Sequence, residues 1–262
     1  MMIGLKGHAA LVTGSTQGIG RAIALSFAEA GADVMVHGRE ECDEGHGVVD
    51  ACRKMGVRAE FLAADLLGDP QEILPKLHSR AAEAVGSIDI LVNNAGQFFD
   101  VPFEQMTTER FERTMRLNVA TPYFLTQLFA RQWIESKTPG RVLIIGSING
   151  RLAEPGSTAY DISKGAVEMM VKTLAVALAP NKIRVNGLAP GLVRTPQTSW
   201  IETNDVKRQW LEHHIPAGVI PQADVCGPAA VFLCSDAAEY ISGHMLAVDG
   251  AMSAWQHPRP QK

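Results

Sequence analysis

Seven short runs of valine, isoleucine, leucine and alanine recur along the chain, and they constrain its fold more than any other feature. They occupy residues 9–14, 33–38, 59–65, 88–96, 141–147, 183–190 and 244–250. The runs lack a clean alternation of apolar and polar residues, which is typical of strands buried on both faces of a parallel sheet. Amphipathic stretches between them predict helices at 18–30, 41–55, 70–85, 107–136, 157–179, 199–213 and 225–235. The pattern predicts one α/β domain, residues 1–262, with a doubly wound, seven-stranded parallel sheet.

Composition excludes several classes of function. Hydrophobic residues make up 46% of the chain, which is enough for a sizeable core, and the formal net charge is −4. That charge argues against a protein that binds nucleic acid electrostatically. No apolar run approaches the ~20 residues that span a bilayer, and the N-terminal residues lack the pattern of a secretory signal. We therefore expect a cytoplasmic protein that binds neither nucleic acid nor membrane.

The four cysteines give no sign of disulfides or of a metal site. They are Cys42, Cys52, Cys226 and Cys234, and none lies in a CxxC pair. We expect reduced thiols and no bound metal. The Pro-rich, polar tail, residues 251–262, is expected to leave the core.

A glycine-rich segment, TGSTQGIG, follows the first expected strand at residues 13–20. Its glycines permit a tight turn, a close approach of the backbone to a pyrophosphate and close packing of the next helix on the sheet. The N-terminus of that helix offers free N–H groups and the positive end of its dipole to phosphates. Alone, the segment could also be a bare turn, but its place between strand and helix favours a dinucleotide site. The expected contacts are Gly14, Ser15, Thr16, Gln17, Gly18, Ile19 and Gly20.

The end of the second expected strand indicates which dinucleotide binds. An NAD site usually has an acid there for the ribose 2′-hydroxyl, whereas an NADP site has a basic residue nearby. Here the strand ends in VHGRE, so that Gly38 stands where the acid is expected and Arg39 follows. We therefore favour NADP(H), with Arg39 on the 2′-phosphate. The alternative is NAD(H), with Glu40 or Glu41 on the ribose.

The segment YDISK, residues 160–164, places a tyrosine and a lysine on one face of an expected helix. Free tyrosine has a pKa of ~10 and is a poor base at neutral pH. A neighbouring ammonium group and the positive charge of an oxidised nicotinamide both favour the phenolate, which would make Tyr160 a usable acid and base. The alternative is an inert pair on a helix surface.

Other motifs accompany this pair in a fixed order. Ser147 ends the fifth expected strand, NNAG ends the fourth at 93–96, Asn118 lies in the helix after it, and Pro190-Gly191 follows the sixth. With TGxxxGIG and YxxxK in this order, the chain resembles the short-chain dehydrogenase/reductase family, in its short single-domain branch, over about residues 5–250. The resemblance implies a Rossmann fold and transfer of a hydride between a ketone or secondary alcohol and a nicotinamide cofactor.

The resemblance also implies catalytic roles. Tyr160 would exchange a proton with the substrate oxygen, and Ser147 would hold that oxygen. Lys164 would lower the pKa of Tyr160 and bind the nicotinamide ribose. Asn118 would connect Lys164 to a proton relay through a kink in the main chain and a water. Taken singly, each residue also has a structural explanation, such as a strand exit, a helix cap or a turn.

The remaining implied contacts surround the cofactor and the substrate. Asp65, with Leu66 beside it, would contact the adenine. Further implied cofactor contacts are the backbones of Asn93, Ala95 and Gly96, and the residues Pro190, Gly191, Val193 and Thr195, together with Tyr160 and Lys164. Substrate contacts are expected from Ser147, Asn149, Tyr160, Phe98 and Trp200, with Phe99 and Trp210 as further candidate walls.

Residues 192–216, after Pro190-Gly191, are expected to form a lid over the substrate. The lid is both polar and aromatic and has no basic cluster, so a sugar or polyol, a β-keto acyl thioester, and another small ketone or alcohol all stay open. The resemblance implies a homotetramer with helices 107–136 and 157–179 as interfaces. Val167, Met170, Val171, Leu174 and Leu178 of the second helix would serve either the interface or the core.

Two other classes of function compete with an oxidoreductase. A regulator that binds the nucleotide and senses redox state is disfavoured by the complete set of Ser147, Tyr160 and Lys164. A sugar-nucleotide epimerase or dehydratase is disfavoured by the glycine spacing and by the short chain after the sixth strand.

Overall fold

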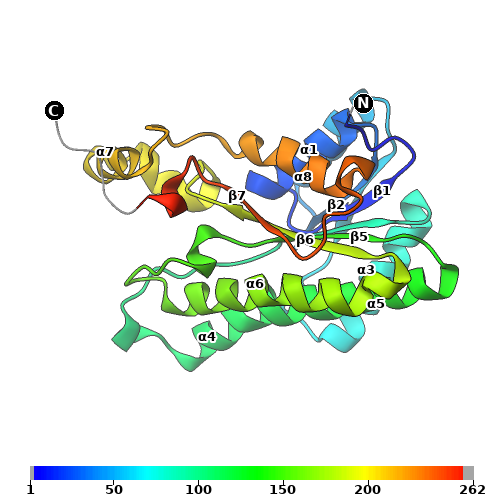
Figure 1. The fold of residues 1–262 in the computed structure, drawn as a ribbon, viewed down its shortest axis with the longest axis horizontal. Coiled ribbons are helices and arrows are strands. Elements are labelled where there is room, and N and C mark those ends of the chain that lie inside the picture. Colours follow the sequence, from blue (N-terminus) through cyan, green and yellow to red (C-terminus); the bar gives the residue numbers. More distant parts are fainter. Residues whose placement is uncertain (1–2, 256–262) are drawn as a thin grey trace.

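The computed structural model describes residues 3–255, and seven parallel strands form the centre of this part of the chain (Figure 1). Their order across the sheet is β3-β2-β1-β4-β5-β6-β7. The predicted α/β fold with a seven-stranded parallel sheet is therefore confirmed. The strands are β1 (Ala9–Val12), β2 (Asp33–Gly38), β3 (Ala59–Ala63), β4 (Ile90–Asn93), β5 (Arg141–Ile145), β6 (Arg184–Pro190) and β7 (Met245–Val248).

The strand order reverses direction next to β1. Val12 of β1 pairs with Val36 of β2 on one side and with Val92 of β4 on the other. The connections after β1 and β4 therefore run to opposite faces of the sheet and leave a crevice at the carboxyl ends of these strands. In open α/β sheets, ligands bind at this kind of crevice.

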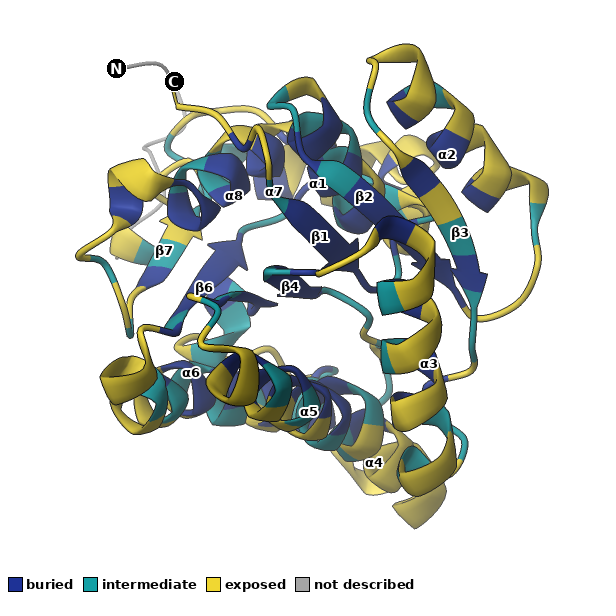
Figure 2. Cartoon of the chain, turned by 90° about the vertical axis from the view of Figure 1, so that its right-hand side faces the viewer, coloured by how far each residue is buried: buried dark blue, intermediate teal, exposed yellow. Residues whose placement is uncertain are grey.

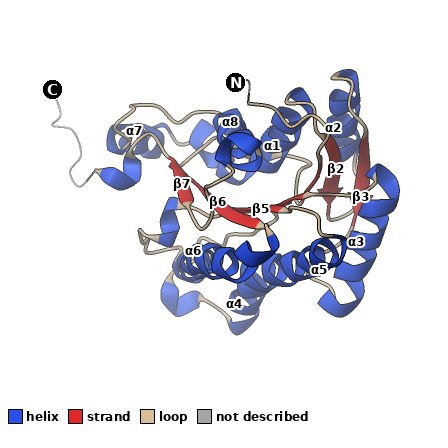
Figure 3. Ribbon diagram, turned by 45° about the vertical axis from the view of Figure 1, so that its right-hand side comes forward, coloured by secondary structure: helices blue, strands red, loops and turns tan. Residues whose placement is uncertain are grey.

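One face of the sheet is covered by α1 (Gly18–Glu29), α2 (Asp43–Lys54) and α8 (Cys226–Cys234), seen above the strands in Figure 3. Ile23 and Phe27 of α1 are fully buried against the sheet. Helices cover the opposite face of the sheet too. The strands are therefore apolar on both sides, which explains why their sequences do not alternate between apolar and polar residues.

The other face carries α3 (Pro70–Val85), α5 (Thr121–Ser136) and α6 (Thr158–Leu178), with α4 (Thr108–Met115) outside them. Leu74 of α3 and Leu125 and Trp133 of α5 are buried. The indole N–H of Trp133 donates to the carbonyl of Ile88 at 2.7 Å. Figure 2 shows the resulting pattern, in which the strands and inward helix faces are buried and the outward helix faces are exposed.

The apolar residues of α6 divide between core and surface. Val167, Met170 and Val171 are buried in the core, and Leu174 and Leu178 pack against it partly buried. The side chains expected to serve either an interface or the core therefore serve the core. The apolar side chains that α6 exposes are Ile162, Met169 and Val176.

Two predicted helices were wrong in their continuity. The helix expected over 107–136 consists of α4, a π-helical turn at Arg116–Ala120, and α5. The helix expected over 199–213 is a 3₁₀ segment, Pro196–Glu202, followed by α7 (Asp205–His214). The first break contains Asn118, whose side chain hydrogen-bonds to the backbone of Gln97. The second precedes Asn204, whose side chain caps α7. The spacing of apolar residues along a helix does not indicate such contacts.

The lid has a small apolar core of its own. Ile201, Leu211, Ile215 and Ile220 are buried together, with Trp200 packed against them. Among residues 3–255, no helix combines the length and the apolar character needed to cross a membrane. Of the tail expected to leave the core, residues 256–262 lie outside the described residues.

Candidate active site

A cleft of about 720 Å³ opens at the carboxyl ends of the central strands. It extends from the glycine-rich segment after β1, past the exits of β4 and β5, to the lid. Because parallel strands all end at the same edge of the sheet, segments far apart in the sequence meet here. The cleft therefore brings the glycine-rich segment and the YDISK segment into one site.

The glycine-rich segment lies tightly against its surroundings. Gly14 and Gly18 have φ angles of 62° and 56°, a region that side chains disfavour. A Cβ atom on Gly20 would lie 2.3 Å from the carbonyl oxygen of Gly14, so α1 begins against the turn before it. These glycines let the backbone turn and leave the start of α1 facing the cleft.

Arg39 and Gly38 lie at the end of β2, on the wall of the cleft. The Arg39 side chain is 68% exposed and its Nη2 lies 2.7 Å from Oε1 of Glu40. A Cβ atom on Gly38 would lie 2.8 Å from Cγ2 of Thr16 and 2.9 Å from Cζ of Phe61. A side chain at the position where an NAD site usually has its acid would therefore require Thr16 or Phe61 to shift.

The side chain of Asn94, and not that of Asn93, faces the cleft. The Asn93 side chain is turned to the other side of the strand, where its Nδ2 donates to Thr126 Oγ1 at 3.0 Å. The Nδ2 atom of Asn94 donates to the carbonyls of Thr13 and Gly14, at 2.8 and 2.9 Å. Successive strand side chains point to opposite faces, so the side chains of Asn93 and Asn94 have different surroundings. The expected contact of the Asn93 backbone with the cofactor stays a prediction.

Tyr160 and Ser147 meet in the cleft. Tyr160 lies in the first turn of α6, and Ser147 follows β5, with its hydroxyl accepting from the N–H of Asn149 at 3.1 Å. Burial raises the pKa of Tyr160 to about 12, against a smaller lowering from its interaction with the Ser147 hydroxyl. The phenol is therefore neutral over the whole physiological range.

Lys164 is 7% exposed, and its Nζ donates to the carbonyl of Ile145 at 2.8 Å. Its Nζ lies 5.4 Å from the centre of the Tyr160 ring. Burial lowers the pKa of Lys164 to about 8. Desolvation is the largest influence on the pKa of both side chains. The lowering of the Tyr160 pKa by Lys164 together with an oxidised nicotinamide stays a prediction.

Asn118 lies in the π-helical turn and is 3% exposed. Its Oδ1 accepts from the N–H of Gln97 at 2.9 Å, and its Nδ2 donates to the carbonyl of Gln97 and to Ser163 Oγ, at 2.9 and 3.0 Å. The side chain therefore fixes the backbone after the NNAG motif against α6. The expected kink in the main chain is this π-helical turn, and the proton relay stays a prediction.

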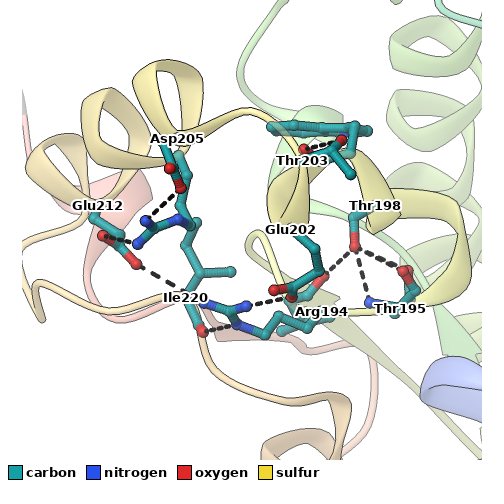
Figure 4. Close-up of polar contacts among 11 residues, drawn as sticks. Arg194, Thr195, Thr198, Glu202, Thr203, Asp205, Glu212 and Ile220 are labelled. Carbon is teal, nitrogen blue, oxygen red and sulfur yellow. Dashed lines mark hydrogen bonds and ion pairs between the residues drawn. The ribbon is translucent and has the colours of Figure 1, made fainter.

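The lid is joined at its base by Arg194 (Figure 4). Its backbone N–H donates to the carbonyl of Pro221 at 2.9 Å, and its Nε donates to that of Ile220 at 3.1 Å. The same guanidinium pairs with Glu202 and lies 3.9 Å from Glu212. Arg194 thus connects the start of the lid with Glu202 and Glu212 inside the lid and with the residues just after it.

Thr195 follows Arg194 and borders the glycine-rich segment. Its N–H donates to Thr198 Oγ1 at 2.8 Å, which starts the 3₁₀ segment. Its Cγ2 would lie 3.5 Å from a Cβ atom on Gly18. The lid and the first turn after β1 therefore meet at the cleft.

Most of the expected site residues line the cleft. Those that do are Gly14, Thr16, Gln17, Gly18, Ile19, Gly20, Arg39, Asp65, Leu66, Ala95, Gly96, Phe98, Ser147, Asn149, Tyr160, Lys164, Pro190, Gly191, Val193, Thr195 and Trp200. Ser15, Asn93 and Asn118 lie behind the lining. Ser15 is fully buried, and its hydroxyl donates to the carbonyl of Val12 at 2.7 Å.

The substrate end of the cleft has an aromatic and a polar part. The Phe98 ring packs edge-on to that of Tyr160, with 5.3 Å between centres, and the Trp200 ring lies 4.2 Å from Nζ of Lys207. Trp210, a candidate wall, lies against His214 outside the lining, and Phe99 is outside it as well. Polar lining residues that the sequence did not indicate are Gln97, Asp100, Arg113, Glu154 and Lys207.

His37 and Asn94 also line the cleft without having been predicted. Each is a polar residue at the end of an apolar run, one or two positions from a residue that was singled out. That placement at the carboxyl end of a parallel strand is the signal that could have identified them.

Comparison with known proteins agrees with this geometry. A family model described as Enoyl-(Acyl carrier protein) reductase matches residues 14–253. L-rhamnose 1-dehydrogenase (NADP(+)) of Thermoplasma acidophilum is 34% identical over 251 residues, which cover 96% of this chain and 98% of that protein. The 3-oxoacyl-[acyl-carrier-protein] reductase of Aquifex aeolicus is 34% identical over 252 residues, covering 96% and 100%.

Solved structures agree as well. The gluconate 5-dehydrogenase from Burkholderia cenocepacia, in complex with NADP and tartrate, superposes with a TM-score of 0.90 at 32% identity, over 97% of this chain and 98% of that one. The cleft at the switch in strand order, the convergence of Ser147, Tyr160 and Lys164, and full-length relatives lead to one conclusion. The chain belongs to the short-chain dehydrogenase/reductase family of NAD(P)-dependent enzymes.

Proposed function

We propose that the protein is an NADP(H)-dependent oxidoreductase that interconverts a ketone and a secondary alcohol, with Tyr160 as the general acid and base. The observation that supports this most is that Ser147, Tyr160 and Lys164 line the same cleft as the glycine-rich segment. A proton donor, a second hydroxyl and a cation are thereby adjacent to a site for a dinucleotide.

The bound cofactor would supply or accept the hydride at the carbonyl carbon. In reduction, the neutral Tyr160 phenol gives its proton to the carbonyl oxygen, and its raised pKa suits this direction. The Ser147 hydroxyl donates to the same oxygen and holds it beside Tyr160. In oxidation, Tyr160 must first lose its proton, and the nearby ammonium of Lys164 together with an oxidised, positively charged nicotinamide favours that loss.

The cofactor preference rests on the end of β2. Arg39 is the cation at the place where a 2′-phosphate would lie, and Gly38 leaves no side chain to accept a bond from a free 2′-hydroxyl. Relatives named for NADP(+), and solved structures with bound NADP, support the same choice. NAD(H) binding through Glu40 is the alternative, since Glu40 also lines the cleft.

The proposed class of substrate rests on the residues that line the cleft near the lid. Gln97, Asn149 and Glu154 provide donors and acceptors beside Tyr160, which suits a sugar or polyol better than a long acyl chain. Relatives named as dehydrogenases of rhamnose and gluconate support this choice, and the relative named as a 3-oxoacyl reductase keeps that substrate in the test.

We also propose a homotetramer in the cytoplasm. Exposed apolar side chains on α5 and α6, such as Tyr123, Phe124, Ile162 and Met169, support burial of these helices between subunits. Light scattering coupled to size exclusion would give the subunit number directly.

The test of function follows absorbance of the reduced nicotinamide over sugars, polyols, sugar acids, β-keto esters and simple ketones, with each cofactor in both directions. Tyr160→Phe is assayed in parallel and should lower kcat at least ~100-fold while NADPH still binds. Turnover retained in Tyr160→Phe would refute the role of the phenol. Tight NADPH binding without turnover of any compound would favour a redox-sensing regulator.

A further inference from the structure

His37, the residue before Gly38 in β2, is a buried histidine that the proposed reaction does not use. It is 2% exposed and borders the cleft behind the glycine-rich segment. Both ring nitrogens have partners in different parts of the chain. Nδ1 lies 3.1 Å from the backbone nitrogen of Gly14, and Nε2 lies 3.1 Å from the carbonyl oxygen of Ala64.

These two contacts define the state of the ring. A backbone N–H can only donate, so Nδ1 must be the unprotonated acceptor. A carbonyl can only accept, so Nε2 must be the nitrogen that carries the proton. The ring is therefore neutral with one tautomer, and burial, which lowers the pKa of His37 to about 4, keeps it so at physiological pH despite the opposing effect of Asp65.

The backbone of His37 is tied to the same segment. Its N–H donates to Ser15 Oγ at 3.0 Å, and its carbonyl accepts from the N–H of Ser15 at 2.9 Å. Gly14 begins the turn after β1, whereas Ala64 follows β3 and precedes Asp65. His37 thus spans the two segments between which the adenosine half of a dinucleotide would lie.

We propose that His37 is a positioning residue of the cofactor site, whose imidazole sets the spacing between Gly14 of the glycine-rich segment and Ala64 after β3. The proposal rests on the proposed function only in taking NADP(H) as the ligand. It predicts that His37 affects binding of the adenosine half and leaves the chemistry at Tyr160 unchanged.

Three variants separate the two contacts. His37→Leu removes both, His37→Asn offers an acceptor near the place of Nδ1, and His37→Gln offers a donor near the place of Nε2. His78→Gln is the matched control, because His78 Nε2 is also hydrogen-bonded, to Gln132 Oε1 at 2.7 Å, but lies away from the cleft. Thermal unfolding identifies the variants that fold.

Calorimetric titration with NADPH and with 2′,5′-ADP gives the binding readout, and initial rates at saturating NADPH give kcat. We expect His37→Leu to weaken both ligands roughly tenfold or more, the single-contact variants to recover part of that loss, and kcat to change less than about twofold. If His37→Leu does not fold, the Asn and Gln variants provide the comparison.

Affinities within about twofold of wild type in the folded variants would overturn the proposal, as would a loss confined to kcat or an equal loss in His78→Gln. Failure of the proposed function gives a different result. In that case, wild-type protein itself either binds no NADPH or turns over no carbonyl compound.

Discussion

Tyr160, the proposed general acid and base, depends on its surroundings in opposite ways for the two directions of reaction. Burial holds Tyr160 neutral, and the Ser147 hydroxyl is the one side chain that lowers its pKa among the causes that act on it. The free energy that separates phenol from phenolate is therefore set locally, by desolvation against one hydrogen bond.

Removing that hydrogen bond should displace the pH dependence of alcohol oxidation. In Ser147→Ala the pKa of Tyr160 rises further, so the rise of kcat/KM with pH moves to higher pH, in addition to a loss of rate. Reduction, which uses the neutral phenol, keeps its profile at neutral pH. pH–rate profiles in both directions measure this, with Ser136→Ala at the far end of α5 as the control. An unmoved profile would contradict the assignment.

Lys164 should lower the stability of the fold. Below pH 8 it is charged in both the folded and unfolded states, and its burial in the folded state is unfavourable. Replacing it in Lys164→Met removes this charge and leaves the Ile145 carbonyl without its partner, for a net stabilisation of about 1–2 kcal/mol at pH 7. That corresponds to a rise in Tm of about 2–8 °C.

The pH dependence provides the control for that change. Between pH 8 and 10.5 the folded protein has lost this proton while the unfolded chain retains it, so wild-type stability rises with pH. The advantage of Lys164→Met should therefore shrink over this window. Calorimetry at pH 7 and at pH 9.5 measures both values, and a variant that is less stable at pH 7 would refute the argument.

At the scale of elements, Arg194 makes the lid one unit. Its guanidinium joins Ile220 to Glu202, and the neighbouring Thr195 contacts the glycine-rich segment. Small displacements of this side chain should therefore change how the 3₁₀ segment and α7 lie over the substrate.

Arg194→Gln should reduce kcat/KM roughly tenfold, mainly through substrate KM, since charge-assisted bonds are lost while the catalytic side chains stay in place. Arg208→Gln is the matched control, because Arg208 pairs with Asp205 and Glu212 within α7 alone. Steady-state kinetics and the rate of chymotrypsin cleavage in the lid measure the effect. Equal results for the two variants would exclude a special role for Arg194.

The positions of helices and strands could be predicted from the sequence where a single physical requirement determines which residues occur. Buried parallel strands produce apolar runs, and a phosphate-binding turn needs glycine, so β1, β2 and the start of α1 could be located in advance. Helical periodicity did not indicate the π-helical turn, because that turn depends on Asn118 reaching Gln97 across the fold, and only the family resemblance implied a kink there. The choice between Asn93 and Asn94 also needed the orientation of β4, which a buried strand does not reveal in its sequence.

At the scale of the whole molecule, the cleft is bordered by segments that lie far apart in the sequence. The glycine-rich segment, the exit of β5 and the lid all border it. A bound cofactor would contact all three and should stabilise the molecule as a whole. At a concentration ~100 times Kd, NADPH should add about 2.7 kcal/mol, or roughly 5–10 °C in Tm.

Comparing the Tm shifts produced by NADPH and by NADH separates the contribution of Arg39 to cofactor binding from other contributions. In Arg39→Ala the shift in Tm produced by NADPH should fall well below its wild-type value, whereas the shift produced by NADH should stay within error. Thermal shift measurements at matched ligand concentrations test this. Equal losses for NADPH and NADH would remove the argument for a 2′-phosphate at Arg39.

The tight packing around Gly38 bears on how the cofactor preference could be re-engineered. A carboxylate introduced by Gly38→Asp would press on Thr16 and Phe61, and the ring of Phe61 is itself packed within 2.4 Å of where a Cβ atom on Gly45 would lie. Gly38→Asp alone should therefore weaken NADH as well as NADPH, and it should favour NADH only in combination with Thr16→Ala and Phe61→Leu. Calorimetric titration of the single and triple variants measures this dependence. Cofactor preference in this enzyme would then depend on Gly38, Thr16 and Phe61 together. A change from one nucleotide to the other during evolution would have to pass through variants that bind both poorly.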